Sequence, residues 1–365
     1  MKIVETFIVA IIGAVVFSLL HIPLAWMLGS ITGVMIWHLG VKRELDCPFS
    51  FRQVASVLFG YMLGTSFTRE TAWDIGRQLP YMAVTTISLV LFSLAMGYLV
   101  AKKSGISVAS GIFGSVPGGL SQMLVISEEI EEANVSIVSF MQTIRLLAVI
   151  FIIPFLTVHG LSKGAISSAG SAVTSNATSV SLFPWWTYLL YIPVAITGAW
   201  GGKLIRLPAA IITGPLLFTA IIAIVTGIQA PPLPGPLLIV SQLIFGAYIG
   251  LTMKVSDFGI FKKIGGFTVT SSILLVGAAL AISQVLAYLT GASASTSFLS
   301  TAPGGIAEMG VTASIVHADL SMVSSYQLFR MFFIMLFVPP LLKKWLLWRK
   351  NRSSMLATGK EGRES

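Results

Sequence analysis

Long apolar blocks with almost no ionised side chains are the feature that most constrains this chain. Four of them cover residues 81–101, 185–202, 267–289 and 331–342. About 20 mostly apolar residues can cross the hydrocarbon core of a bilayer as a helix. Only 10% of the residues are charged, whereas a water-soluble domain carries about 25%. Because the blocks are continuously apolar rather than alternating, they disfavour a β-barrel. The sequence therefore predicts an all-α polytopic membrane protein.

Two halves of the chain carry the same motifs in the same order. Pro117 in SVPGGLSQM matches Pro303 in TAPGGIAEM at an offset of 186 residues (303 − 117), and Arg145 matches Arg330 at an offset of 185 (330 − 145). Motifs that recur at nearly one offset indicate duplication. The sequence therefore predicts an N-terminal membrane repeat, a polar linker, a C-terminal membrane repeat and a basic cytoplasmic tail, at residues 1–160, 161–183, 184–348 and 349–365.

Ten segments, five in each half, are apolar enough to be predicted as spanning helices. They are residues 4–21, 24–40, 52–68, 80–101, 135–157, 185–204, 207–228, 236–253, 266–288 and 320–342. Glycines recur in the third segment of each half, and we interpret them as helix-packing residues. These glycines are Gly60, Gly64, Gly246 and Gly250.

The orientation of the halves depends on the Pro-Gly-Gly segments, residues 106–130 and 292–316. If each enters and leaves on one side, every half has five crossings and the halves are inverted. Most of the 23 basic residues then fall on the cytoplasmic side together with both termini, as the positive-inside rule requires. If the segments cross, the halves are parallel and the basic loops are split between the two sides. We therefore predict two inverted five-helix repeats, each with a re-entrant Pro-Gly-Gly hairpin.

The Pro-Gly-Gly triplets predict a binding site. Proline breaks a helix, and glycine lets the chain turn sharply and other groups approach the backbone. Helix ends exposed at a break can bind an anion or a cation, and matched breaks in two repeats are typical of a transporter substrate site. The predicted substrate-binding residues are Pro117, Gly118, Gly119, Ser121 and Gln122 in the first copy, and Pro303, Gly304, Gly305 and Glu308 in the second. Glu308 replaces Gln122, which suggests coupling to Na⁺ or H⁺.

Two arginines inside predicted spans extend the candidate site. Arg145 follows Gln142 by three residues, and Arg330 follows Gln327 by three residues. Charge at this depth is costly and usually faces a protein interior or a cavity. We consider two roles: direct contact of these Gln and Arg side chains with the substrate, or a structural role. The structural role is an anchor for the hairpin tip or an internal ion pair, for example Arg330 with Glu308 or Arg145 with Glu128.

The remaining chemistry-bearing residues argue against other classes of protein. The single cysteine, Cys47, excludes an internal disulfide, and the four histidines show no ligand spacing that would predict a metal site. No phosphate-binding loop or catalytic triad is recognisable. We attribute the net charge of +9 to membrane topology rather than to nucleic acid. The sequence thus predicts neither an enzyme nor a resident cofactor.

The paired motifs SVPGGLSQM and TAPGGIAEM, with the downstream Gln-x-x-Arg copies, resemble the AbrB-type duplicated membrane proteins of bacteria over about residues 5–350. Members of that family are often labelled ammonia monooxygenase or regulator, and they are unrelated to the small soluble DNA-binding proteins of the same name. The resemblance implies a bacterial cytoplasmic membrane but no substrate. The plan of two halves with hairpin tips is similar to that of glutamate/sodium symporters, in architecture only.

Taken together, these features predict a secondary transporter that moves a small solute, with a lean towards an anion, by alternating access. Its expected partners are the lipid bilayer and the solute, and a homodimer is left open. Two alternatives are a membrane-embedded regulatory or accessory subunit without transport, and the membrane subunit of an oxygenase. A transporter needs a polar cavity at the tips, a regulator needs an exposed partner face, and an oxygenase needs metal.

Overall fold

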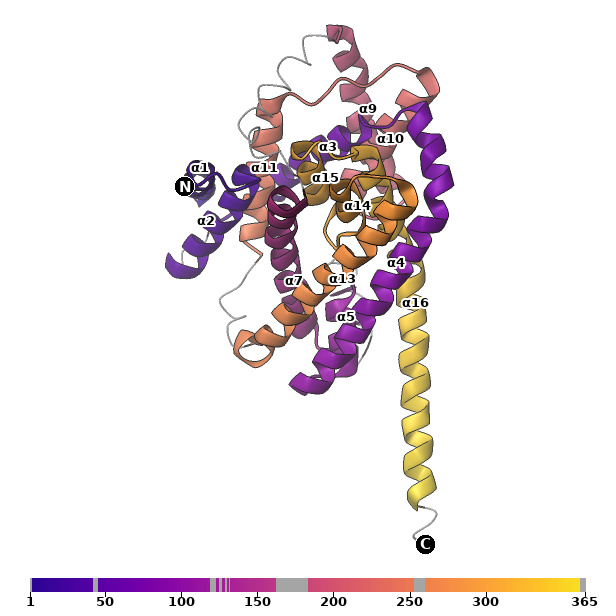
Figure 1. Cartoon of the computed structure of the whole chain (residues 1–365). Helices are drawn as coiled ribbons and strands as arrows, with labels where there is room; N and C mark the ends of the chain where they lie inside the picture. Colours follow the sequence, from indigo (N-terminus) through magenta and orange to yellow (C-terminus); the bar gives the residue numbers. More distant parts are fainter. Residues whose placement is uncertain are drawn as a thin grey trace.

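The computed structural model describes residues 2–41, 45–118, 123–124, 127–128, 130, 132–161, 183–252 and 260–361. Throughout that part of the chain the regular structure is helical (Figure 1). Three predicted tip residues, Gly119, Ser121 and Gln122, lie outside the described residues, as does nearly all of the predicted linker.

Each of the ten predicted spans corresponds to a helix. These helices are α1 (Lys2–Leu19), α2 (Ala25–Val41), α3 (Phe49–Gly64), α4 (Arg69–Ser104), α7 (Val135–Leu156), α9 (Trp185–Leu204), α10 (Ala210–Thr226), α11 (Gly235–Gly250), α13 (Gly266–Thr290) and α16 (Leu320–Glu361). Short π-helical turns, η1 (Thr157–Leu161) and η3 (Phe261–Gly265), adjoin α7 and α13.

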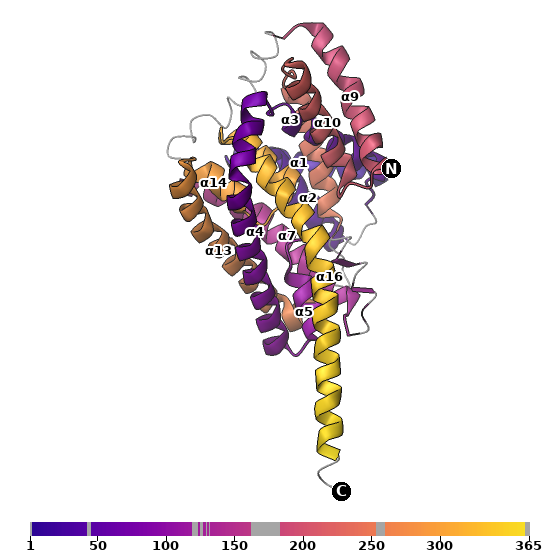
Figure 2. The ribbon, with the colours of Figure 1, turned by 90° about the vertical axis from the view of Figure 1, so that its right-hand side faces the viewer.

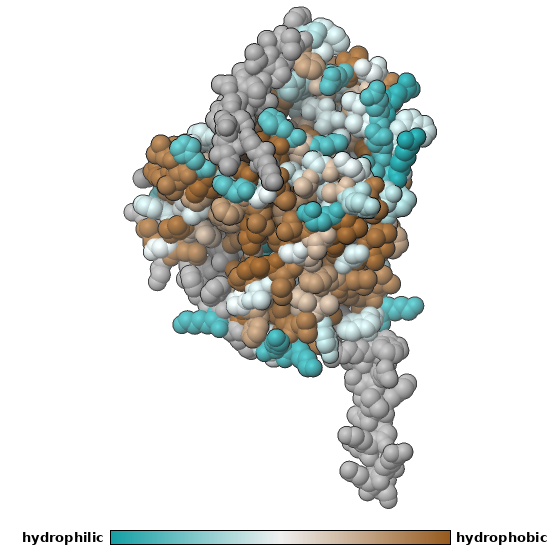
Figure 3. Space-filling model, in the orientation of Figure 1, coloured by the Kyte–Doolittle hydropathy of each residue, from teal (hydrophilic) through white to brown (hydrophobic). Residues whose placement is uncertain are grey.

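Five of these helical stretches are long and apolar enough to cross a membrane: Lys2–Leu19, Arg69–Ser104, Val135–Leu161, Gly266–Thr290 and Leu320–Leu342. The visible face of the space-filling view carries a broad apolar band between hydrophilic ends (Figure 3). Among the large apolar side chains at the surface, Ile8, Ile12 and Leu19 of α1 are more than half exposed. Such a band suits lipid, so the chain is an all-α polytopic membrane protein.

Two helices are longer than predicted. Helix α4 begins at Arg69, not near residue 80, because Thr68 and Thr71 form a capping box. The Thr68 hydroxyl accepts a hydrogen bond from Thr71 N, and the Thr71 hydroxyl accepts one from Thr68 N. Pro80 lies inside this helix. Helix α16 continues from the last predicted span into the basic tail as far as Glu361, and its end projects beyond the rest of the molecule (Figures 1 and 2).

The helices pack in two groups, and each group draws on both halves of the sequence. Helices α1, α2, α3, α9, α10 and α11 pack mainly on one another and form what we call the scaffold group. Helices α4, α5 (Val108–Ser115), α7, α13, α14 (Ala294–Thr301), α15 (Ile306–Ile315) and α16 form the hairpin group. Contacts between the groups run mainly from α3 and α10 to α4, α15 and α16.

The third helix of each half packs against a helix of the other half. Helix α3 packs on α10 of the second half, and α11 packs on α2 of the first. A Cβ at Gly60 would overlap the carbonyl oxygen of Ile212 in α10, and a Cβ at Gly246 would overlap Ser30 in α2. Only glycine allows these approaches, so the predicted packing role of these two glycines is confirmed.

Candidate functional site

Both Pro-Gly-Gly segments begin with a short, capped helix that stops at the same point. Ser107 caps α5 by accepting from Ser110 N at 3.1 Å, and Ser293 caps α14 by accepting from Thr296 N at 3.2 Å. Each helix ends one residue before an extended residue that precedes proline: Val116 (ψ 128°) and Ala302 (ψ 134°). A residue before proline disfavours the helical conformation, so the local sequence sets both breaks.

The base of each hairpin is tied to the helix that follows it. The backbone N–H of Asn134, just before α7, donates to Ser110 Oγ at 2.7 Å. The N–H of Asp319, just before α16, donates to Thr296 Oγ1 at 3.0 Å. The matched residues thus place the Gln-x-x-Arg copies on α7 and α16 beside the helix ends at the breaks.

In the first copy, the Gln and Arg side chains bind the open carbonyl end of α5. Gln142 Nε2 donates to Phe113 O at 2.7 Å and to Val116 O at 3.0 Å. Arg145 Nη1 donates to Ser115 O at 3.2 Å and, at close range, to Val116 O. Arg145 Nη2 donates to Gln142 Oε1 at 2.6 Å. The last carbonyls of a helix lack partners within it, and these two side chains supply them.

The second copy repeats this arrangement at the matched atoms. Gln327 Nε2 donates to Leu299 O at 2.8 Å and to Ala302 O at 3.1 Å. Arg330 Nη1 donates to Thr301 O at 3.4 Å and closely to Ala302 O, while Nη2 donates closely to Gln327 Oε1. The two matched segments therefore use the same side chains to satisfy the carbonyl groups at a helix break.

Of the two roles considered for the arginines, the structure shows the tip anchor. Arg145 is 8% exposed and Arg330 is 5% exposed. Within the described residues their partners are carbonyl and amide oxygens, and neither arginine forms the predicted ion pair with Glu128 or Glu308. The two guanidinium groups are also close enough to repel each other electrostatically. Direct contact of these arginines with a substrate stays a prediction.

The second tip carries a buried carboxylate. Glu308 lies in the first turn of α15 and is 4% exposed. Its carboxyl group therefore lies near the N-terminal end of α15, which is the positive end of the helix dipole. A Cβ at Gly305 would overlap this carboxylate, so a larger residue there would require the Glu308 side chain to move.

Helix α3 of the scaffold group packs against α15, and its Arg52 was not predicted as a site residue. The positive charge of Arg52 acts electrostatically on the Glu308 carboxyl group across the boundary between the groups. Arg52 Nη1 also donates to the hydroxyl of Tyr248 in α11 at 3.1 Å, and the guanidinium lies over the Tyr248 ring at 4.3 Å. Sequence patterns assigned Arg52 to a basic boundary, because nothing in α3 itself indicates that α15 lies beside it.

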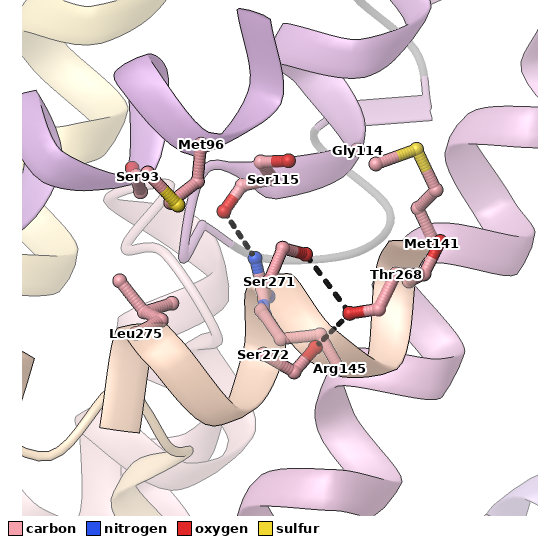
Figure 4. Close-up of a pocket in the computed structure, with 10 residues that line it drawn as sticks. All are labelled: Ser93, Met96, Gly114, Ser115, Met141, Arg145, Thr268, Ser271, Ser272 and Leu275. Carbon is pink, nitrogen blue, oxygen red and sulfur yellow. Dashed lines mark hydrogen bonds between the residues drawn. The ribbon is translucent and has the colours of Figure 1, made fainter. Parts of the chain in front are cut away.

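A small cavity lies beside the first hairpin, between α4, α5, α7 and α13 (Figure 4). Its volume, measured as the space open to the centre of a water-sized sphere, is about 10 Å³. Six polar side chains line it: Ser93, Ser115, Arg145, Thr268, Ser271 and Ser272. Two of its buried atoms, Arg145 Nε and Ser115 Oγ, have no hydrogen-bond partner. We call this space the Arg145 cavity.

Of the predicted site residues that the structure describes, those of each half lie together. Pro117 and Gly118 lie at the break anchored by Gln142 and Arg145, and Pro303 to Gly305 lie at the break anchored by Gln327 and Arg330. The serines of the Arg145 cavity were not predicted, apart from the general polarity around the tip. The signal that could have identified these serines is a hydroxyl group on the buried side of an otherwise apolar helix.

Comparison with known proteins supports the resemblance in the motifs. A family model described as "Transition state regulatory protein AbrB" matches residues 26–346. The protein named "Uncharacterized protein YhjN" of Bacillus subtilis is 30% identical over 353 residues, covering 90% of this chain and 89% of the relative. The protein named "Putative regulator AbrB" of Escherichia coli is 26% identical over 355 residues, covering 95% and 97%.

Proposed function

The chain belongs to the AbrB family, and we propose that it is a secondary transporter of a small solute. The observation that carries this proposal is the pair of helix breaks held open by matching Gln and Arg side chains. Backbone groups freed at membrane depth are tolerated only where protein or a polar cavity satisfies them. Paired breaks from two repeats are how secondary transporters build a site near the midplane.

The division into scaffold and hairpin groups supports alternating access. Both breaks belong to the hairpin group, and one boundary runs between it and the scaffold. That boundary is largely apolar: Ile306, Ala307 and Val311 of α15 share a cluster with Phe59 and Leu63 of α3. A packed apolar contact between two bodies can slide or rock without breaking a network of polar bonds. In this proposal the halves are inverted and both termini are cytoplasmic.

The charges around the tips favour an anionic solute. Within the described residues two buried arginines face the breaks, and Glu308 is the acidic side chain buried beside them. The start of α15 adds the positive end of a helix dipole. Glu308 is then the group that binds the coupling H⁺ or Na⁺, because one buried carboxylate near a substrate site can exchange a cation as the protein changes conformation.

The proposal is tested with purified protein in proteoliposomes on a solid-supported membrane. Small mono- and dicarboxylates and amino acids are presented with and without Na⁺ at two pH values. We expect a saturable, solute-dependent charge movement whose ion dependence is lost in Glu308→Gln. Gln is nearly isosteric with Glu, so solute binding should survive, as measured by solute-induced thermal stabilisation.

A second readout does not require the solute to be known. Ala307, 1% exposed at the boundary between the groups, is replaced by cysteine in a Cys47→Ser background. Alternating access predicts that impermeant thiol reagents reach Ala307→Cys from either face of oriented vesicles. If no reagent reaches it from either side and no solute moves charge, the transport proposal is wrong.

One observation favours a regulatory subunit as the second candidate. Helix α16 runs through the basic tail to Glu361 and projects from the body (Figure 2), and the Escherichia coli relative is named as a regulator. Truncation after Leu342 distinguishes the two candidates. A transporter should keep its solute-dependent charge movement after truncation. A regulator should lose the binding of its partner, and thiol reagents should not reach Ala307→Cys in it.

A further inference from the structure

The Arg145 cavity contains two hydrogen-bond donors that nothing else uses. The other hydroxyl groups that line it donate to backbone oxygens: Ser93 to Val90 O at 2.8 Å, and Ser271 and Ser272 to Thr268 O at 2.9 Å each. Arg145 Nε and Ser115 Oγ have no partner. Figure 4 shows both side chains at the cavity, together with the hydroxyls of α13. Buried donors are nearly always satisfied, so the cavity calls for a guest that accepts hydrogen bonds.

The charge of the surroundings specifies the kind of guest. Arg145 is buried, and its partners in the described residues are neutral oxygens. Dipoles of carbonyl groups stabilise a guanidinium but do not cancel its charge. An uncompensated charge in a membrane interior is costly and calls for a counter-ion. Among the described residues, no carboxylate lines the cavity.

The matched place in the second half is lined by different side chains. Ala279 replaces Ser93 (279 − 93 = 186), and Tyr326 replaces Met141 (326 − 141 = 185). Thr301, which matches Ser115, donates its hydroxyl to Ala279 O at 3.1 Å. Arg330 also has a bond that Arg145 lacks, from Nη2 to Gly304 O at 2.6 Å. Buried hydroxyl groups without a partner also occur in the second half, on Ser297 and Tyr326. The hydroxyl that matches Ser115, however, is hydrogen-bonded there.

We propose that the Arg145 cavity binds one monatomic anion, of which chloride is the biological representative. The anion would accept hydrogen bonds from Arg145 Nε and Ser115 Oγ and compensate the charge of the buried guanidinium. The volume of about 10 Å³ admits a guest of about one non-hydrogen atom. A carboxylate or phosphate is therefore too large, which separates this site from a site for the transported solute.

The test measures unfolding of the purified full-length protein by tryptophan fluorescence. Sodium chloride or sodium bromide replaces sodium gluconate at constant ionic strength. We expect the unfolding midpoint to rise and saturate with either halide. Loss of one hydrogen bond to a charged ligand weakens binding about tenfold, so Ser115→Ala should raise the half-saturating chloride concentration by about that factor. Thr301→Ala, the matched control, should leave it unchanged.

A crystal grown in bromide should show an anomalous peak between Arg145 and Ser115. If Ser115→Ala does not fold, Ser115→Thr serves instead. Threonine is the residue at the matched position of the second hairpin, and its extra methyl group would partly fill the cavity. The proposal is overturned if all three salts have the same effect on the unfolding midpoint, because the cavity then holds a water rather than an anion. It is also overturned if Ser115→Ala and Thr301→Ala have the same half-saturating chloride concentration, because Ser115 is then not a ligand. No step uses transport, so the result is independent of the proposed function.

Discussion

The two hairpins share their backbone anchoring and differ in the side chains around it. In both, Gln and Arg bind the carbonyl oxygens at the end of a short helix, at positions matched atom by atom. The first hairpin has a small cavity at which Arg145 Nε and Ser115 Oγ have no partner. The second has a further bond from Arg330 to Gly304 and the buried Glu308.

This difference indicates which parts of the duplicated site are fixed and which have diverged. The anchors satisfy backbone groups that have no alternative partner inside a membrane, so both copies need them. The side chains beyond the anchors are free of that requirement. We infer that the second hairpin provides the acidic, cation-responsive half of the site and that the first provides a more positive half.

The largest expected effect concerns the orientation of the two hairpins. Ser104 and Thr290 lie at matched positions (290 − 104 = 186), at the ends of α4 and α13. If the halves are inverted, an impermeant thiol reagent on intact cells should label Thr290→Cys and label Ser104→Cys only after permeabilisation. Equal labelling from one face would make the halves parallel and remove the main support for a shared transport site.

That experiment needs a background free of Cys47. Burial, together with the nearby Asp46 carboxylate, raises the pKa of the Cys47 thiol. The thiolate is the reactive form, so Cys47 should react slowly at neutral pH in the unaltered protein. Cys47→Ser removes the remaining signal, and this variant alone is the blank.

The next effect compares the two anchors. Arg330→Met should leave the carbonyls of Thr301 and Gly304 without this donor, while Ala302 O keeps its bond from Gln327. Each unsatisfied buried carbonyl costs about 1–3 kcal/mol, so we expect a loss of about 2 kcal/mol or more in stability. Arg145→Met should cost about 1 kcal/mol less, because it lacks the third carbonyl bond. The measurement is the thermal unfolding midpoint in detergent.

The exposed Arg77 on α4 gives a matched control, since Arg77→Met removes a guanidinium without freeing a buried carbonyl. If Arg145→Met is the more harmful of the two anchor variants, the extra bond of the second hairpin contributes nothing to stability. If both behave like Arg77→Met, the anchors do not hold the breaks open.

The smallest effect tests how each hairpin packs on its long neighbouring helix. A Cβ at Gly97 of α4 would lie 2.6 Å from Gly111 O of α5, whereas the second half has Ser283 and Ser297 at the matched positions. Gly97→Ala should therefore cost about 1–3 kcal/mol through overpacking, and Ser283→Ala should cost less. Gly277→Ala, where a Cβ meets nothing within 4 Å, is the control. Equal midpoints for Gly97→Ala and Gly277→Ala would contradict this packing.

The sequence predicted the class of the fold and the place of each hairpin break. Apolar runs of sufficient length need a helix in lipid, because every backbone group must be satisfied within the segment. Pro117 and Pro303 disfavour a helical conformation at the residue before them, so the ends of α5 and α14 follow from local chemistry. The repeat offset then predicted that Gln142, Arg145, Gln327 and Arg330 would have equivalent roles.

Tertiary structure decided what those residues touch and how the halves combine. The sequence left open whether the arginines pair with carboxylates, contact a substrate or anchor the tips, because a guanidinium can donate to any oxygen within reach. The start of α4 at Arg69 depended on the Thr68 cap rather than on hydropathy. The exchange of α3 and α11, the Arg145 cavity and the approach of Arg52 to Glu308 all join residues far apart in sequence. Hydropathy and spacing describe one segment at a time, whereas these contacts arise only when helices from both halves pack together.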